Sequence, residues 1–170
     1  ELAPQYGRLI RHALGTLDSG VAGTYVYKVG TLPPGLTIEK QFIGVAGGYE
    51  YFQYTGCKVN SLKVSVKAEG MIECSASIMG ANETLSATPA DADPTDNGHD
   101  PFDGFQCVIT NSAGVAIGDV TEIDFTIENN LDGNSYVIDG TGKRKSIPAG
   151  TAKVSGNLKA LFEDVTLYNA

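Results

Sequence analysis

The segment from residue 36 to residue 80 constrains the fold of this chain most strongly, because much of it follows the two-residue period of a β-strand. Within it, Lys63-Val-Ser-Val-Lys67 alternates strictly between polar and apolar side chains, and the alternation resumes from Ile72 after a turn at Glu69-Gly70. Successive side chains of a strand point to opposite faces, so this pattern predicts a half-buried β-hairpin. The segment contains no catalytic motif.

The apolar positions of this hairpin also predict its register. A two-residue loop would pair Val66 with Glu73 and mix the two faces, whereas the three-residue loop Ala68-Glu69-Gly70 pairs Val66 with Ile72. The longer loop needs a left-handed residue at its end, and Gly70 supplies it. The opposite face is then small and polar, and it consists of Ser61, Lys63, Ser65 and Lys67 against Ser77, Ser75, Glu73 and Met71.

The rest of the chain predicts one all-β domain with a short helix at its start. A chain of 170 residues fits a single domain, and 21 glycines among many short alternating runs are typical of a turn-rich β protein. Pro4 suits the first helical position and Gly15 the residue after the last turn, so we expect a helix over 4–14. It either packs on the sheet, which we favour, or forms a contact with a partner. We expect further strands over 23–29, 36–45, 49–54, 120–128 and 151–162, and alternation over 105–109. The expected fold is a β-sandwich or partial barrel of antiparallel strands.

Residues 81–103 differ from the rest in composition. They carry six acidic residues and no Lys or Arg, which accounts for six of the eight net negative charges of the chain. Pro89, Pro94 and Pro101 argue against a central strand, so we expect one long acidic loop. A calcium loop that begins at Asp93 would have Gly104 where the twelfth-position Glu belongs, so the spacing does not support a metal site.

The sequence shows no motif for enzymatic chemistry, and we expect neither a cofactor nor a bound metal. Three widely spaced cysteines form no metal-ligand pattern, and neither His12 nor His99 lies in a motif with a nucleophile. Gly140 to Ser146 departs from a phosphate-binding loop. Its Lys143, Arg144 and Lys145 form either a solvated basic turn or a contact with an acidic surface on a neighbouring subunit.

The charge of the chain bears on its partners. A net charge of −8 without a basic stripe argues against a protein that grips nucleic acid. No apolar run approaches the length of a membrane span. The outward-facing Glu122, Asp124 and Glu128 form either a solvated sheet face, opposite Lys153 and Lys159, or a lining past which DNA slides.

The chain also resembles the tail tube proteins of long-tailed bacteriophages. The block from Tyr54 to Leu62 is the most specific part of the likeness. The other parts are Leu9 to Gly15, Leu36 to Glu39, Asn129 to Leu131 and Gly156 to Tyr168. Family members commonly have further sequence on both sides, so residues 1–170 are expected to be one domain of a longer protein.

The resemblance implies a structural subunit, from a phage or a prophage, rather than an enzyme. Such subunits form hexameric rings that stack around a tape measure protein, contact other tail proteins and later let the genome pass without specific binding. They are made in the host cytoplasm and end in the virion tail. Their sheets join edge to edge into a closed barrel. The candidate lumen or assembly face consists of Lys63, Ser65, Glu73, Glu122, Asp124 and Glu128.

Two other classes of protein compete with this interpretation. One is a ligand-binding β-sandwich such as a carbohydrate or adhesin module, against which the absence of Trp argues. The other is a hydrolase, for which no motif is present.

Overall fold

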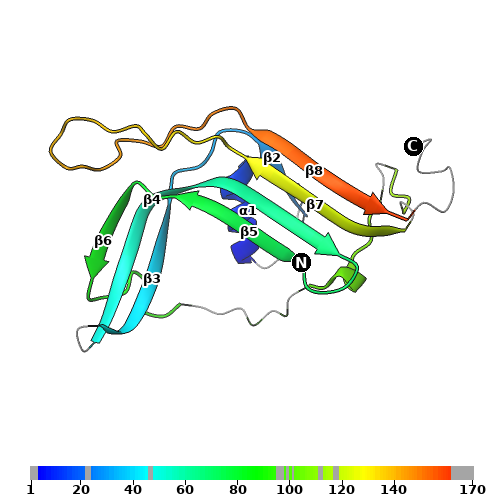
Figure 1. Ribbon diagram of the computed structural model, residues 1–170, viewed down its shortest axis with the longest axis horizontal. Coiled ribbons are helices and arrows are strands. Elements are labelled where there is room, and N and C mark those ends of the chain that lie inside the picture. The colour runs from blue at the N-terminus through cyan, green and yellow to red at the C-terminus, as the bar shows by residue number, and fades with distance from the viewer. Residues whose placement is uncertain are drawn as a thin grey trace.

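The computed structural model describes residues 4–21, 24–45, 48–94, 98, 100, 102–110, 113–116 and 119–161, and it shows an antiparallel β fold with one N-terminal helix (Figure 1). This confirms the expected fold class, and the sheet of a single chain does not close into a barrel. The elements are α1 Pro4–Leu14, β1 Gly15–Val21, β2 Thr24–Val29, β3 Leu36–Val45, β4 Gly48–Lys67, β5 Glu73–Met79, β6 Asn82–Ser86, the 3-10 helix η1 Gly104–Gln106, β7 Val120–Glu128 and β8 Lys153–Ala160.

The 20-residue strand β4 organises the main sheet. Its first half pairs with β3 and β6, and its second half pairs with β5 and β7, while β8 is added beside β7. The expectation of separate strands over 49–54 and from residue 59 is therefore wrong. Gly56, with φ of 64°, and a register shift between Val59 and Ser61 bend the strand at the change of partners without ending it.

The hairpin of β4 and β5 has the predicted register. Lys63 lies opposite Ser75, Ser65 lies opposite Glu73, and Gly70 has φ of 98°. The ladder ends at Ser65 and Glu73, two pairs earlier than expected, because the backbone N–H of Ile72 donates to the carbonyl of Phe102 at 3.0 Å instead of continuing the strand.

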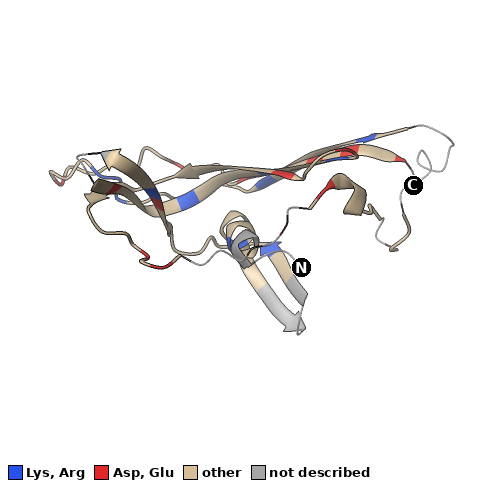
Figure 2. Ribbon diagram, turned by 90° about the horizontal axis from the view of Figure 1, so that it is seen from below, with Lys and Arg blue, Asp and Glu red and all other residues tan. Residues whose placement is uncertain are grey.

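A small core lies between α1 and one face of the sheet. Ala13 of the helix packs with Val59, Leu62 and Ile127, and these four side chains are buried. The partly buried residues Leu9, Ile10 and Leu14 surround them. Figure 2 shows α1 and the β1–β2 hairpin on this side of the sheet, whereas no described element covers the other side.

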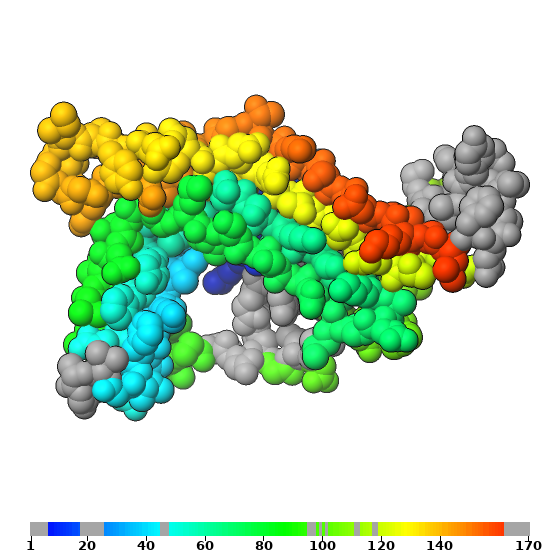
Figure 3. Space-filling view, in the orientation of Figure 1, coloured from blue at the N-terminus to red at the C-terminus, as the bar shows by residue number. Residues whose placement is uncertain are grey.

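The chain exposes far more surface than a compact protein of its size. Its accessible surface is 11897 Å², whereas a compact monomer of this mass exposes about 8000 Å². The space-filling view shows the reason, which is an extended outline with projecting arms rather than a rounded body (Figure 3). Large apolar side chains on the sheet, including Phe125, Val154 and Leu158, remain exposed beyond the reach of α1.

Two segments differ from the expected loops and strands. Within 81–103, Asn82–Ser86 forms β6 against residues 51–55 of β4, so the acidic segment is not a loop throughout. Glu39 of β3 holds the following part, since its carboxylate accepts hydrogen bonds from Gln53 Nε2 at 2.9 Å and from the N–H of Ala90 at 2.7 Å. The alternation over 105–109 belongs to η1 and to irregular backbone rather than to a strand.

Strand β1 was not anticipated, and β8 is shorter than the strand expected over 151–162. The final residue of that expected strand, Phe162, lies outside the described residues.

Candidate assembly face

The main sheet has one polar face, and its side chains come from four adjacent strands. All six residues of the candidate lumen or assembly face lie on it. Ser65 of β4 lies opposite Glu73 of β5 on one side and opposite Asp124 of β7 on the other. Lys63 is two residues away from Ser65 along β4, so its side chain points to the same face. The two-residue period of each strand thus brings together positions that lie far apart in the sequence. The set is Lys63, Ser65, Glu73, Glu122, Asp124 and Glu128.

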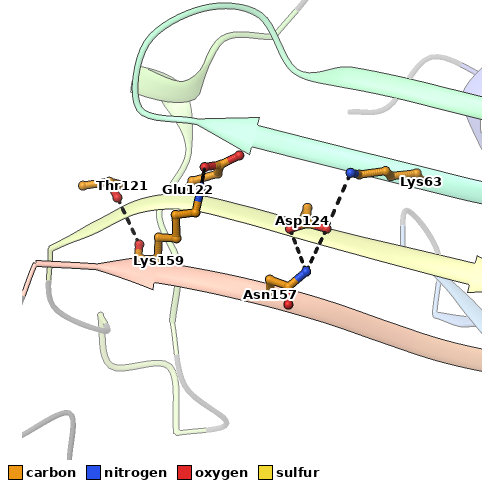
Figure 4. A network of polar contacts seen from close by, with 6 residues as sticks. All are labelled: Lys63, Thr121, Glu122, Asp124, Asn157 and Lys159. Atoms are coloured by element: carbon orange, nitrogen blue, oxygen red, sulfur yellow. Dashed lines mark hydrogen bonds and ion pairs between the residues drawn. The ribbon is translucent and has the colours of Figure 1, made fainter.

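Ion pairs and hydrogen bonds connect the strands across this face (Figure 4). Lys63 Nζ lies 3.7 Å from Asp124 Oδ1, and Lys159 Nζ donates to Glu122 Oε2 at 2.5 Å. Asn157 Nδ2 lies 3.3 Å and 3.4 Å from the two carboxylate oxygens of Asp124. The hydrogen bond from Lys159 is the main reason why the pKa of Glu122 is lowered, and the same bond raises the pKa of Lys159.

The face is balanced in charge rather than acidic. Glu122 is opposite Lys67 on one side and Lys159 on the other, and Glu128 is opposite Lys153. The face therefore carries four lysines and four carboxylates, so the acidic strip of β7 is neutralised by its neighbouring strands. The balancing residues are Lys63, Lys67, Lys153 and Lys159 against Glu73, Glu122, Asp124 and Glu128.

The sheet has two free edges beside this face. The strand order across this part is β5, β4, β7 and β8, and every neighbouring pair is antiparallel. It follows that β5 and β8, the two outer strands, run in opposite directions. In the described parts of the chain, no strand pairs with the outer side of either one.

The basic turn at 143–145 does not present three equivalent cations. Arg144 is turned into the molecule, where Nε donates to the carbonyl of Gly133 and Nη1 donates to that of Gly80, both at 2.6 Å. Its guanidinium also lies 5.5 Å from the ring centre of Tyr136. Lys143 and Lys145 are exposed. The proposed subunit contact can therefore involve the two lysines, whereas Arg144 holds the loop in place.

Sequence reasoning missed the structural role of Asn129, which is only 3% exposed. Its Nδ2 donates to the carbonyls of Ala13 in α1 and Val59 in β4, both at 2.9 Å. Asn129 thereby joins the helix to the sheet. The sequence signal that could have indicated this role is the position of Asn129, an amide side chain directly after the alternating strand 120–128.

Few features of the described residues suggest catalysis. No group of three or more His, Cys, Asp or Glu is placed to hold a metal ion among them. His12 lies on α1, where burial and then the charge of Arg11 lower its pKa, and His99 lies outside the described residues. A concavity of about 610 Å³ between Tyr54, Glu83 and Lys143 is open to solvent. In the part of the chain that is described, no helix is long and apolar enough to span a bilayer.

Comparison with known sequences gave one family. A family model described as phage tail tube protein matches residues 1–170, which is the whole sequence. No curated protein matches the chain.

Proposed function

Because this chain belongs to the phage tail tube protein family, whose members assemble with themselves and with other components of the virion tail, we propose that its copies join through β5 and β8 into closed rings. The observation that carries this proposal is the pair of free edges that run in opposite directions. The β8 edge of one copy can continue antiparallel into the β5 edge of the next, with both copies in the same orientation. Such a head-to-tail contact closes into a ring when the rotation per subunit allows it.

The composition of the two edge strands supports their pairing. Neither contains Pro, and β8 exposes Val154 and Leu158 on its apolar face. Soluble proteins usually protect long exposed edges with proline, charges or covering loops. Of these, the two strands carry the charges Glu73, Lys153 and Lys159 on their polar face, whereas their other face is apolar. Edge pairing would place these two side chains beside the apolar side chains of β5 in the next copy, which are Cys74, Ala76 and Ile78.

The exposed area has the right size for a permanent assembly. The 11897 Å² of accessible surface exceeds that of a compact monomer by about 3900 Å². Permanent homo-oligomeric interfaces bury about 2000–5000 Å². Two edge contacts per copy, with additional contacts between rings, would cover an area of this order.

The polar face is the proposed lining of the channel. Helix α1 and the β1–β2 hairpin add bulk to the apolar side of the sheet (Figure 2), and a curved sheet has more room on its convex side. The polar face would then line the concave side. Because four carboxylates balance its four lysines, this lining would offer passing DNA no net positive charge to bind.

We propose six subunits per ring, stacking of the rings around a tape measure protein, and later passage of DNA, all of which follow from the family resemblance. The exposed Lys143 and Lys145 are proposed to contact a neighbouring subunit.

Substitution of Val154 tests the edge contact. Val154 is 58% exposed in the single chain, so Val154→Lys leaves the fold of the isolated chain intact. In the ring, the same substitution places a charge among the apolar side chains of the edge contact between β8 and β5. We expect Val154→Lys to remain monomeric in light scattering and electron microscopy under conditions in which the wild type forms rings. Val154→Thr, which keeps the shape and strand propensity, should still form rings. Rings of normal size from Val154→Lys would contradict the edge contact.

A further inference from the structure

The loop between β7 and β8 presents an apolar knob, which we define as Tyr136, Val137 and Ile138. These side chains are 54%, 45% and 108% exposed, and Ile138 is thus completely open to solvent. The loop projects from the end of β7 and the start of β8, near the bend at which β4 changes partners (Figure 1). Three consecutive exposed apolar residues at a loop tip are costly in a free protein and typical of a contact site.

The knob is held in one conformation by its own loop. Arg144 binds two backbone carbonyls, and the N–H of Lys145 donates to the carbonyl of Ser135 at 2.9 Å. Asp139 Oδ1 accepts hydrogen bonds from the N–H and the hydroxyl of Thr141, at 3.0 Å and 2.7 Å. Because these bonds already order the loop, little conformational entropy would be lost when the knob binds.

A pocket of about 180 Å³ lies at the opposite end of the same sheet. It opens beside η1, where β7 begins and β4 ends. Its apolar lining includes Val66, Cys107, Val108, Ile109, Val120 and Ile123. The lining also includes the polar residues Lys67, Thr121 and Glu122, and the pocket is partly open to solvent. A cavity of about 150 Å³ accommodates benzene, so the volume is sufficient for the four side-chain carbons of an isoleucine.

We propose that the knob of one copy inserts Ile138 into this pocket of a copy in the adjacent ring. The proposal rests on the proposed function, because it needs rings to stack. The loop that carries the knob and the end of β4 that borders the pocket lie toward opposite ends of the sheet (Figure 1), so the contact is head to tail and repeats along an open stack. Each ring then presents knobs at one end and pockets at the other.

The charges around the two surfaces are complementary. The loop 131–150 carries three basic and two acidic residues, a net charge of +1. The described residues that frame the pocket, 67–71, 102–110, 113–116 and 119–123, carry one Lys against Glu69, Asp103, Asp119 and Glu122, a net charge of −3. Lys159, which pairs with Glu122, reduces this to −2. Opposite net charges favour this orientation and disfavour contacts between two like ends. Lys143 and Lys145, beside the knob, supply the exposed positive charges.

A disulfide between copies tests the contact directly, because Cys107 lines the pocket and is exposed. In a Cys74→Ser background, Ile138→Cys should form intermolecular disulfides with Cys107 when assembled tubes are oxidised with diamide. Cys57 is buried and should not react. We expect a ladder of covalent oligomers on a non-reducing gel, and its loss when Cys107→Ser is added. A ladder that persists without Cys107, or assembled tubes that give no ladder, would overturn the docking.

A second pair of variants separates stacking from ring formation. Ile138→Asp should form rings but raise the subunit concentration needed for tubes by about tenfold or more, whereas Ile138→Leu should form tubes as the wild type does. Tubes from Ile138→Asp at the wild-type concentration would overturn the docking alone, whereas wild-type rings that never stack would overturn both the docking and the proposed stacking. A wild-type chain that stays monomeric would overturn the proposed function as well.

Discussion

Replacement of the buried amide of Asn129 should release α1 from the sheet. Its Nδ2 donates to two carbonyl oxygens, those of Ala13 and Val59, at 2.9 Å each, and the residue is 3% exposed. In Asn129→Ala both oxygens lose this donor in a place that water reaches poorly. A buried polar group left unsatisfied costs about 1–3 kcal/mol. We therefore expect the free energy of unfolding to fall by about 2–4 kcal/mol, allowing for partial entry of water.

The measurement is urea unfolding followed by far-ultraviolet circular dichroism, at a protein concentration that keeps the wild type monomeric. For a chain of this length, the expected loss corresponds to about 5–15 °C in melting temperature. Hydrogen exchange adds a local readout, since the amides of α1 should exchange faster in Asn129→Ala while those of β7 change less.

Asn157→Ala is the matched control, because it removes the same amide from an exposed position. Asn157 contacts Asp124 at only 3.3 Å and 3.4 Å, and its loss should cost less than about 0.5 kcal/mol. If both variants unfold with equal free energies, the buried amide does not hold the helix to the sheet and the reasoning is wrong.

Two further predictions concern the loop and the polar face. Arg144→Lys keeps the positive charge but lacks the forked guanidinium that binds two carbonyls at once. The loop should therefore open more often, and chymotrypsin should cleave it after Tyr136 about tenfold faster than in the wild type. An unchanged cleavage rate would show that Arg144 does not anchor the loop. The pKa of Glu122 is lowered in the folded chain, chiefly by the hydrogen bond from Lys159. The ionised carboxylate therefore stabilises the folded state at pH values above the ordinary carboxyl pKa of 4.5, and this stabilisation is lost as the pH falls through the lower pKa of the folded state. Carbon-detected NMR titration should place the midpoint of Glu122 below 4.5 in the wild type and nearer to 4.5 in Lys159→Met, and equal midpoints would contradict this.

Sequence patterns predicted those elements in which side-chain alternation and burial agree. Residues 36–45 and 120–128 became β3 and β7 with the expected bounds, and the hairpin of β4 and β5 has the expected register. The candidate face followed for the same reason, because a two-residue period fixes the side of the sheet to which each residue points. That this face lines a channel stays a prediction.

The errors arose where distant contacts decide the local structure. Gly56 is typical of a turn, yet pairing on both sides carries β4 through it. Residues Asn82–Ser86 are mostly polar and show no strand pattern of their own. They form a strand because their backbone pairs with an otherwise unpaired side of β4. The three basic residues at 143–145 are alike in sequence, whereas the carbonyls that bind Arg144 come from positions 80 and 133. Periodicity within one segment contains none of this information.

The length of β4 has a mechanical consequence for a filament. At about 3.3 Å per residue its 20 residues have a length along the chain of roughly 65 Å, and they link the arm of β3 and β6 to the part of the sheet that carries the free edges. A force that pulls along β4 would act parallel to the strands that pair with it. The backbone hydrogen bonds between β4 and these strands would then have to break together rather than one after another. A single covalent segment would thus transmit pulling or bending forces between the two ends of each subunit.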